Sequence, residues 1–413
     1  MILSDPDISL LARQVADRLN ELGKISDEPG RLVRTFLSPA SLRANALVGG
    51  WMREAGLTVV EDAFGNVIGL RRARAGMRKL VIGSHLDTVV DAGRFDGPAG
   101  VLLGIALAAA LPDLPYGLEV VGFSDEEGVR FQSTYLGSRA YAGLITPDEL
   151  ALKDEAGISV GELVTARRAQ GYPDVVVAPD TLLGYIEIHI EQGPILESQN
   201  IPLAIVQGIA GQTRVLAGFT GKAGHAGTTP MLGRHDALPA AAQVILEAEA
   251  YAKAHCPLVA TVGKLEVQPG AGNVIPGAVH FTMDVRGFDD GMRRAALQHF
   301  EGFGAGLAQE RQLSWHWEIK QDSPSVHFGR WLTDELEDLI FDQQGTVPLL
   351  FSGAGHDAAV MAGIGPVAML FVRCREGLSH HPDEYVSPED LTAALRAVVR
   401  LFELPATDLV FSI

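Results

Sequence analysis

The sequence predicts an α/β protein with a largely parallel sheet, into which a smaller α+β unit is inserted. Three observations support this prediction. Short apolar runs alternate with helical stretches through the first half, the middle follows a strand–helix–strand–strand–helix–strand order, and the last part returns to the first pattern. A chain of 413 residues, 47% of them hydrophobic, is long enough for two domains with separate cores.

In the first half, apolar runs predict strands over 79–87, 118–128 and 184–193, and "PAGVLLGIALAAAL" predicts a helix over 98–111. Their alternation indicates parallel strands, and such sheets carry their ligand-binding residues in the loops at the carboxyl ends of the strands. Six polar residues fall at or just past those ends: His85, Asp87, Glu126, Glu127, His189 and Gln192.

The middle of the chain predicts a four-stranded antiparallel sheet with one helical face. Its expected elements are strands over 213–221, 259–270, 277–288 and 313–321, and helices over 234–255 and 290–309. We therefore expect the domain boundaries near Gly211 and Val326. The first domain then consists of residues 1–210 and 327–413, and the inserted domain of residues 211–326.

The last part resumes the first pattern with the strand "VAMLFVR", residues 367–373. It closes with a helix whose start is marked by Ser387 as the capping residue, Pro388 at the first helical position and Asp390 three residues after the cap.

The composition indicates which kinds of binding partner and which cellular compartment to expect. The net charge of -18 argues against nucleic acid and anionic membranes, since both favour Lys and Arg, although a small anionic substrate needs only a local arginine pocket. Two cysteines, Cys256 and Cys374, cannot form a disulfide framework. No signal peptide and no membrane-spanning run are expected, so the prediction is a cytoplasmic protein.

The stretch "GSHLDTVVDAGRFDGPAG" gathers one histidine and three aspartates where the chain leaves a predicted strand. Together with Glu126–Glu127, His189 and His380 of "GLSHHPDEY", they form a mixed nitrogen and oxygen set that suits zinc or manganese. Two ions would need five protein ligands and a shared carboxylate, for which Asp96 is suited. Their charge would acidify a bridging water into a hydroxide nucleophile.

Two adjacent glutamates on one loop cannot easily bind the same ion. One of the pair Glu126–Glu127 is therefore expected to be a ligand, and the other is free to transfer a proton. Asp87 could orient the imidazole of His85, two residues away.

Each of these features alone is weak evidence. A His-x-Asp pair is usually a turn feature, "DEEG" a solvated acidic turn, and a single strand histidine a core residue. Their joint occurrence at predicted strand ends favours the metal site. Six other histidines lack this context and are expected to be structural or exposed: His235, His255, His280, His299, His316 and His327. His380 is preferred over His381 as the ligand, although spacing alone does not separate them.

Seven motifs together resemble those of the dinuclear metal amidohydrolases related to aminoacylases: "GSHLDTV…GRFDGPAGV", "FSDEEGVRF", "HIEQGPILE", "GKAGHAGTTPM", "GNVIPG", "SGAGHDA" and "GLSHHPDE". The resemblance is to the branch that holds allantoate amidohydrolase, N-carbamoyl-L-amino-acid hydrolase and β-ureidopropionase. It implies a zinc-peptidase-like catalytic domain with an inserted lid, a homodimer built through that lid, and two zinc or manganese ions per subunit. The implied metal ligands are His85, Asp96 as the bridge, Glu127, His189 and His380, with Glu126 as general base.

The same resemblance implies five substrate-binding residues: Gln192, Arg214, His225, Asn273 and Arg286. Arg286 with Asn273 would suit a carboxylate, because guanidinium binds carboxylate through two parallel hydrogen bonds. His225 would stabilise an oxyanion, from its own or the partner subunit, while His356 would only line the pocket. We expect hydrolysis of allantoate to ureidoglycine, with N-carbamoyl amino acids as the second choice of substrate. A catalytically silent ligand-binding homologue is the alternative of another class.

Overall fold

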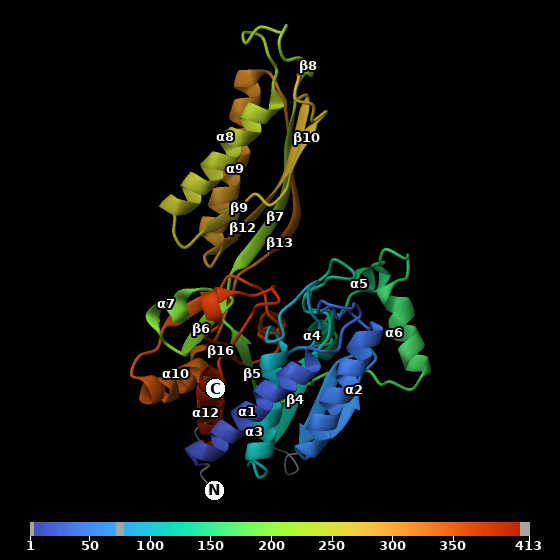
Figure 1. The fold of residues 1–413 in the computed structure, drawn as a ribbon, viewed down its shortest axis with the longest axis vertical. Coiled ribbons are helices and arrows are strands. Elements are labelled where there is room, and N and C mark those ends of the chain that lie inside the picture. The colour runs from blue at the N-terminus through green and yellow to red at the C-terminus, as the bar shows by residue number, and fades with distance from the viewer. Residues whose placement is uncertain (1–3, 72–77, 405–413) are drawn as a thin grey trace. The chain divides into compact units, whose positions relative to one another are not determined.

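The computed structural model describes residues 4–71 and 78–404, which divide into two compact units. The main unit comprises Met1–Gln207 and Phe328–Ile413, and the inserted unit comprises Gly208–His327. Each unit is described by itself (Figure 1). Among the described residues, none of the helices combines the length and the apolar character needed to cross a bilayer.

The main unit is built on a mixed sheet of nine strands, in the order β1-β2-β4-β3-β5-β16-β6-β14, with β15 paired to β6. The strands are β1 (Thr58–Glu61), β2 (Val67–Arg71), β3 (Lys79–His85), β4 (Gly117–Phe123), β5 (Leu182–Ile190), β6 (Leu203–Ile209), β14 (Val326–His327), β15 (Leu349–Ser352) and β16 (Val367–Val372). The four central strands β4, β3, β5 and β16 are parallel, while β2 and β6 flank them in the opposite direction. The predicted α/β class with a mostly parallel central sheet is confirmed.

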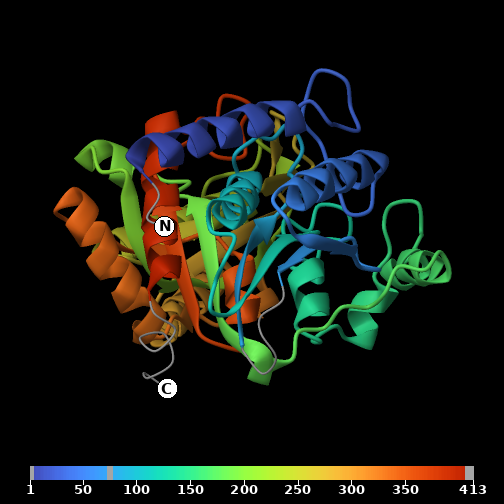
Figure 2. The same cartoon turned by 90° about the horizontal axis from the view of Figure 1, so that it is seen from below.

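The helices of the main unit cover this sheet. They are α1 (Asp5–Leu22), α2 (Pro39–Glu54), α3 (Pro98–Ala110), α4 (Leu136–Tyr141), α5 (Pro147–Ala151), α6 (Val160–Ala169), α7 (Ile195–Gln199), α10 (Arg330–Gln344), α11 (Asp357–Met361) and α12 (Pro388–Glu403), with short 3-10 turns at η1 (Pro179–Thr181) and η2 (Arg375–Gly377). Figure 2 shows α1, α3 and α12 together on one face of the sheet. The last helix begins as predicted, because the Ser387 side chain accepts from the Asp390 N–H and Pro388 follows the cap.

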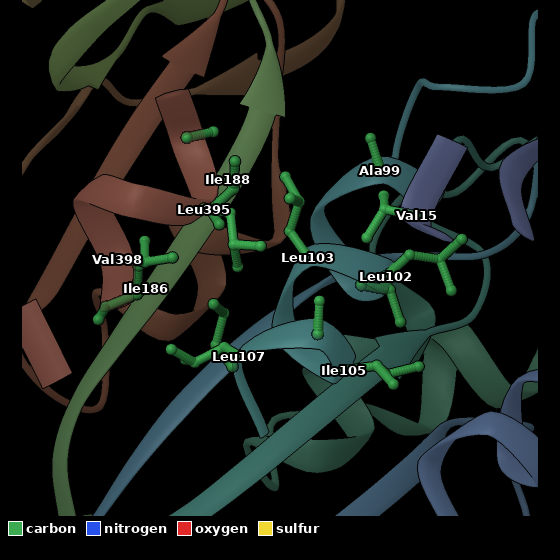
Figure 3. Close-up of a cluster of buried hydrophobic side chains, with 14 of the residues drawn as sticks. Val15, Ala99, Leu102, Leu103, Ile105, Leu107, Ile186, Ile188, Leu395 and Val398 are labelled. Atoms are coloured by element: carbon green, nitrogen blue, oxygen red, sulfur yellow. The ribbon is translucent and has the colours of Figure 1, made fainter. Parts of the chain in front are cut away.

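The core of the main unit forms around α3, whose residues from Pro98 to Ala108 are all buried. A helix that is apolar all round has no solvent face and must be enclosed on every side. Its leucines share one buried cluster with Ile186 and Ile188 of β5 and with Leu395 and Val398 of α12 (Figure 3). This enclosure fixes α3, and with it the loop from β3 that leads into it.

The inserted unit is an antiparallel sheet with α8 (Ala237–Ala254) and α9 (Asp290–Arg311) packed on one face. Its strands are β7 (Gly211–Thr220), β9 (Val259–Thr261), β10 (Leu265–Gln268), β12 (Ala278–Gly287) and β13 (Ser314–Ser323), and a separate two-stranded sheet is formed by β8 (Gly224–His225) and β11 (Val274–Ile275). Alternate residues of β12 are buried against the helices, which explains the alternating pattern of its sequence.

The main sheet of the inserted unit has five strands rather than the four predicted. The expected strand over 259–270 is interrupted near Gly263, and its two halves, β9 and β10, both pair with β12. At the interruption, Lys264 exchanges hydrogen bonds with Thr282 through its own N–H and carbonyl. The apolar pattern alone did not reveal this break.

Candidate metal centre

Parallel strands carry the first group of expected ligands to one edge of the main sheet. In the register of the sheet, Gly83 pairs with Glu187, so His85 and His189, two residues further on, leave neighbouring strands side by side. Asp96 lies in the loop between β3 and α3. Its Oδ1 is 3.0 Å from His189 Nε2 and 3.5 Å from His85 Nε2, and all three side chains are buried.

A second group shares the same aspartate. Asp96 Oδ2 lies 3.3 Å from His380 Nε2, which in turn lies 3.3 Å from Glu127 Oε1. The ligand atoms within each of the two groups lie within 4.8 Å of one another. Asp96 therefore presents one oxygen to each group, which is the geometry that a bridging carboxylate needs. His381 belongs to neither group and is exposed.

The residues of the first group fit a cation. The Nδ1 atoms of His85 and His189 lie 3.1 Å and 2.9 Å from the carbonyl oxygens of Asp87 and Ile190. A carbonyl oxygen can only accept, so each Nδ1 carries the proton and each Nε2 directs a lone pair toward Asp96. Within the described residues, the buried atoms His189 Nε2 and Asp96 Oδ1 have no hydrogen-bond partner. Two electron-rich atoms facing each other at 3.0 Å require a proton or a metal ion between them.

The pKa shifts of the metal-free site agree with this charge arrangement. Hydrogen bonds to Asp96 and Glu127 raise the pKa of His380 to about 10. Burial lowers the pKa of His189, but Asp96 outweighs it and the net shift is upward. In the metal-free protein the imidazole of His380 therefore carries a proton near neutral pH, and metal binding there would release it.

The two adjacent glutamates lie at the end of β4, where the chain turns through Asp125 at a φ of 55°. Glu127 faces His380, whereas Glu126 is buried and close to His85. Burial, and the neighbouring charge of Glu127, raise the pKa of Glu126 well above its usual range, although His85 opposes the shift. A carboxylate with a raised pKa beside a nucleophile site is suited to accept a proton.

Asp87 positions the glutamate pair rather than the histidine. Its Oδ1 accepts the Glu126 N–H at 3.1 Å and its Oδ2 accepts the Glu127 N–H at 3.2 Å. The distance from Asp87 Oδ1 to His85 Nδ1 is 3.7 Å, too long for a hydrogen bond. The expected orientation of His85 comes instead from the main-chain carbonyl of Asp87, because the carboxylate is already engaged by the two amides.

Gln192 lies beside the bridging aspartate. Its Nε2 donates to Asp96 Oδ2 at 2.9 Å and to Ser379 Oγ at 3.1 Å, while its Oε1 is buried and has no hydrogen-bond partner among the described residues. Gly97 makes room for the site, because at a φ of 81° a Cβ there would lie 2.5 Å from the His85 ring. The free acceptor of Gln192 is available to a donor group on a ligand.

Three residues of the site were missed or underestimated from sequence. Ser379 donates its hydroxyl to Asp96 Oδ2, and the buried Glu384 accepts the N–H groups of Phe95 and Asp96. Burial and the charge of Asp96 raise the pKa of Glu384 to about 7. His356 was expected only to line the pocket, and its ring centroid lies 4.3 Å from that of His189. Glu384 is the last residue of the motif "GLSHHPDE", four residues after His380, but no site role was predicted for it.

The inserted unit carries the other expected substrate residues, in two separate places. Arg286 donates to both oxygens of Asp284, at 2.9 and 3.1 Å, and Arg214 lies 3.5 Å from the same carboxylate. His225 and Asn273 lie together on the small β8–β11 sheet, where the Ala226 N–H donates to the Asn273 carbonyl.

The expected pairing of Arg286 with Asn273 is not formed within one chain. The β12 strand runs from Ala278 to Gly287, with Arg286 at one end and the turn from Asn273 at the other. At roughly 3.3 Å per residue, the two positions are separated by about 30 Å. A single small carboxylate cannot bridge that distance, so the two residues cannot hold it together from one inserted unit.

Comparisons with known proteins agree with this site. A model of peptidase family M20/M25/M40 matches residues 81–404. The probable allantoate deiminase of Oryza sativa subsp. japonica is 40% identical over 439 residues, covering 97% of this chain and 89% of that protein. The N-carbamoyl-L-amino acid amidohydrolase of Geobacillus stearothermophilus is 38% identical over 382 residues, covering 90% of this chain and 93% of that protein.

A solved structure of an amidase of the hydantoinase/carbamoylase family from Burkholderia multivorans has a TM-score of 0.88 and 33% sequence identity, covering 95% of this chain and 97% of that one. The predicted branch and the predicted enzyme class, a hydrolase of the amidohydrolase type, are thereby confirmed. The chain belongs to the metal-dependent peptidase family M20/M25/M40.

Proposed function

We propose that this protein hydrolyses a ureido carbon–nitrogen bond, with allantoate as substrate and ureidoglycine, ammonia and carbon dioxide as products. The observation that carries the proposal is the pair of ligand groups that share Asp96, with the buried Glu126 beside them. The 40% identity to a protein named for allantoate, over nearly the whole chain, supports the choice of substrate.

In this proposal His85, Asp96, Glu127, His189 and His380 hold two divalent ions, zinc or manganese. When bound, such ions polarise the carbonyl of the ureido group and lower the pKa of a water molecule to near neutrality. Glu126 takes the proton of that water and later returns it to the leaving nitrogen. Asp87 keeps Glu126 in place, because its carboxylate holds the peptide N–H groups of both glutamates.

Substrate recognition needs an acceptor for ureido N–H groups and a cation for the carboxylate. The unpartnered Oε1 of Gln192 supports the first role, since its own Nε2 is fixed on Asp96 and Ser379. Arg286 and Arg214 support the second role. Both lie against the carboxylate of Asp284 in the inserted unit, and guanidinium groups bind carboxylates through two parallel hydrogen bonds.

The separation of about 30 Å between Arg286 and the His225–Asn273 pair supports a proposal about the oligomeric state. If all three residues contact one substrate, they come from two chains. This supports the expectation of a homodimer built through the inserted unit, with His225 and Asn273 supplied by the partner subunit and His225 stabilising the oxyanion. The inserted unit would then act as a lid whose closure excludes water.

An N-carbamoyl-L-amino acid is the second candidate substrate. It has the same carboxylate and one ureido group, so Gln192 and Arg286 would recognise it in the same way. The 38% identity to a protein named for that reaction favours this candidate almost equally.

The test measures hydrolysis with zinc or manganese present, as ammonia released from allantoate and from N-carbamoyl-L-amino acids, and as free amino acid released from N-acetyl amino acids. The proposal expects the highest kcat/KM with allantoate and little activity on the acetylated compounds, which offer no terminal NH2 to Gln192. Higher kcat/KM on the carbamoyl amino acids would replace the substrate but keep the reaction. Inactivity on all three, with both metal ions bound, would favour the silent binding homologue.

A further inference from the structure

A buried glutamate joins two of the three loops that carry the second group of expected ligands, the loop of Asp96 and the loop of His380. The Glu384 side chain is only 1% exposed, and its Oε1 accepts the N–H of Phe95 at 2.7 Å and that of Asp96 at 3.0 Å. Its Oε2 accepts the Ser379 hydroxyl at 3.4 Å. One carboxylate from the loop after β16 thus holds the main chain of the loop after β3.

The neighbouring backbone leaves space for this carboxylate. A Cβ at Gly93 would lie 2.5 Å from both the carboxylate carbon and the Oε1 of Glu384. Real Cβ atoms do not approach other heavy atoms that closely, so any side chain at Gly93 would displace Glu384 or the loop. The position of Glu384 therefore depends on a close approach between two loops that are far apart in the sequence.

This contact controls the distance between two ligand atoms. Asp96 is held at its own N–H. His380 immediately precedes the turn of residues 381–384, which the Glu384 N–H closes by donating to the carbonyl of His381 at 3.1 Å. The distance from Asp96 Oδ2 to His380 Nε2 is 3.3 Å. If the two loops moved apart, these atoms could no longer reach the same ion. In the first group only Asp96 lies on a loop that Glu384 holds, because His85 and His189 are fixed by strands β3 and β5.

We propose that Glu384 is a positioning residue for the second metal ion, the one expected on Asp96, Glu127 and His380. The inference rests on the metal centre of the proposed function and adds to it a residue that touches neither metal nor substrate. Removing Glu384 is expected to weaken the second ion selectively. Partners that orient metal ligands typically change metal affinity by roughly 10- to 100-fold.

A purely structural role for Glu384 is the competing explanation, and the chain offers a matched control. Asp62 is also 1% exposed, its Oδ1 accepts the N–H groups of Phe64 and Asn66 at 2.9 Å each, and its Oδ2 accepts from the Asn66 side chain. Asp62 organises a turn between β1 and β2 and contacts no expected ligand. Asp62→Asn therefore removes an equivalent buried carboxylate at a place without ligands.

The experiment measures binding of Mn²⁺ alone to the full chain by equilibrium dialysis, for the wild type, Glu384→Gln, Gly93→Ala and Asp62→Asn. Thermal unfolding of each metal-free protein reports its stability. We expect two ions in the wild type, and a roughly 10- to 100-fold weaker second ion with an unchanged first ion in Glu384→Gln. Gly93→Ala keeps Glu384 but places a methyl group against its carboxylate, so it should show the same selective loss of affinity for the second ion. Asp62→Asn should lower the unfolding temperature and retain both ions.

The possible results distinguish failure of the proposed two-ion centre from failure of the proposed role of Glu384. A wild-type protein that binds fewer than two ions would remove the dinuclear centre and this inference with it. A wild type with two ions, together with Glu384→Gln and Gly93→Ala variants that bind both normally, would overturn only the role of Glu384. Equal weakening of both ions in Glu384→Gln and Asp62→Asn would also overturn it, since that pattern follows from general destabilisation.

Discussion

The candidate metal centre of the main unit and the arginine cluster of the inserted unit differ in whether their charged groups already have partners. At the centre, His189 Nε2 and Asp96 Oδ1 are buried, close together and without a hydrogen-bond partner among the described residues. In the inserted unit, Arg286 and Arg214 are already paired with Asp284, and all three side chains are partly exposed. The first region needs a cation to be satisfied, whereas the second carries its own counterion.

Because of this difference, we expect substitutions in the two regions to have effects of different size on activity and binding. Removing a group from the metal centre leaves buried atoms without partners, which is costly. Removing a side chain from the arginine cluster breaks an ion pair that is partly exposed to water. The affinity for a carboxylate substrate should therefore change only moderately.

The largest effect is expected for Glu126→Gln. Glutamine is nearly the same size but cannot accept the proton, so kcat should fall by roughly 10² to 10⁴ while both metal ions remain bound. Glu127→Gln is the matched control at the next position and should lose one ion. Turnover and metal content of the two variants check this together, and a reversed pattern would mean that the two glutamates have exchanged roles.

Arg286→Ala is expected to raise KM for carboxylate substrates and leave the metal content unchanged. A carboxylate deprived of its partner loses about 1–3 kcal/mol, which corresponds to roughly 5- to 150-fold in KM. Arg294→Ala provides the control, because Arg294 is an exposed arginine of the same unit that pairs with Asp290. Unchanged steady-state kinetics toward every carboxylate substrate would exclude Arg286 from recognition.

Removal of the metal ions should make stability dependent on pH in a particular direction. In the metal-free protein the pKa of His380 is raised from 6.5 to about 10 by Asp96 and Glu127. A raised folded-state pKa stabilises the protein fully below pH 6.5, and this contribution is lost as the pH rises toward 10. Unfolding temperatures of the chelated protein should therefore decline across that window. A flat profile for the chelated protein would contradict the proposed proton occupancy.

The smallest effect is expected for Asp284→Asn. If Asp284 competes with the substrate carboxylate for Arg286 and Arg214, its neutralisation should lower KM by about two- to five-fold, the value of a partly exposed ion pair. Asp284→Glu keeps the charge and should resemble the wild type. A higher KM in Asp284→Asn would show that orientation of the arginines outweighs competition, and the contrast between the regions would be weaker than described.

The main sheet and its central strands were predictable, because apolar runs and their alternation are properties of the local sequence. The strand-end rule then places His85, Glu127 and His189 at one edge of the sheet from the sequence alone. The interruption that divides β9 from β10 was not predictable, since it depends on how both halves pair with β12. Local pattern indicates that a segment is extended but does not give its partner.

Two features of the site had no local signal. The Asp87 carboxylate accepts hydrogen bonds from the N–H groups of Glu126 and Glu127, and these bonds depend on the turn at the end of β4. The contact of Glu384 with Asp96 joins residues 288 positions apart. In a sequence, an acid near a histidine in a polar loop is expected to face solvent, and only the packing of two loops shows that it is buried.

The spread of the site along the chain has a consequence for biosynthesis. His85 and His380 lie near opposite ends of the chain, and the whole inserted unit, Gly208–His327, is translated between them. Domains generally fold as units while the ribosome advances at about 5–20 residues per second, so the inserted unit can fold before the last ligand has been made. The emerging chain therefore carries His85, Asp96 and His189 for many seconds without His380. If the site binds two ions, the second ion can be bound only after His380 has been synthesised, when the inserted unit has already been made.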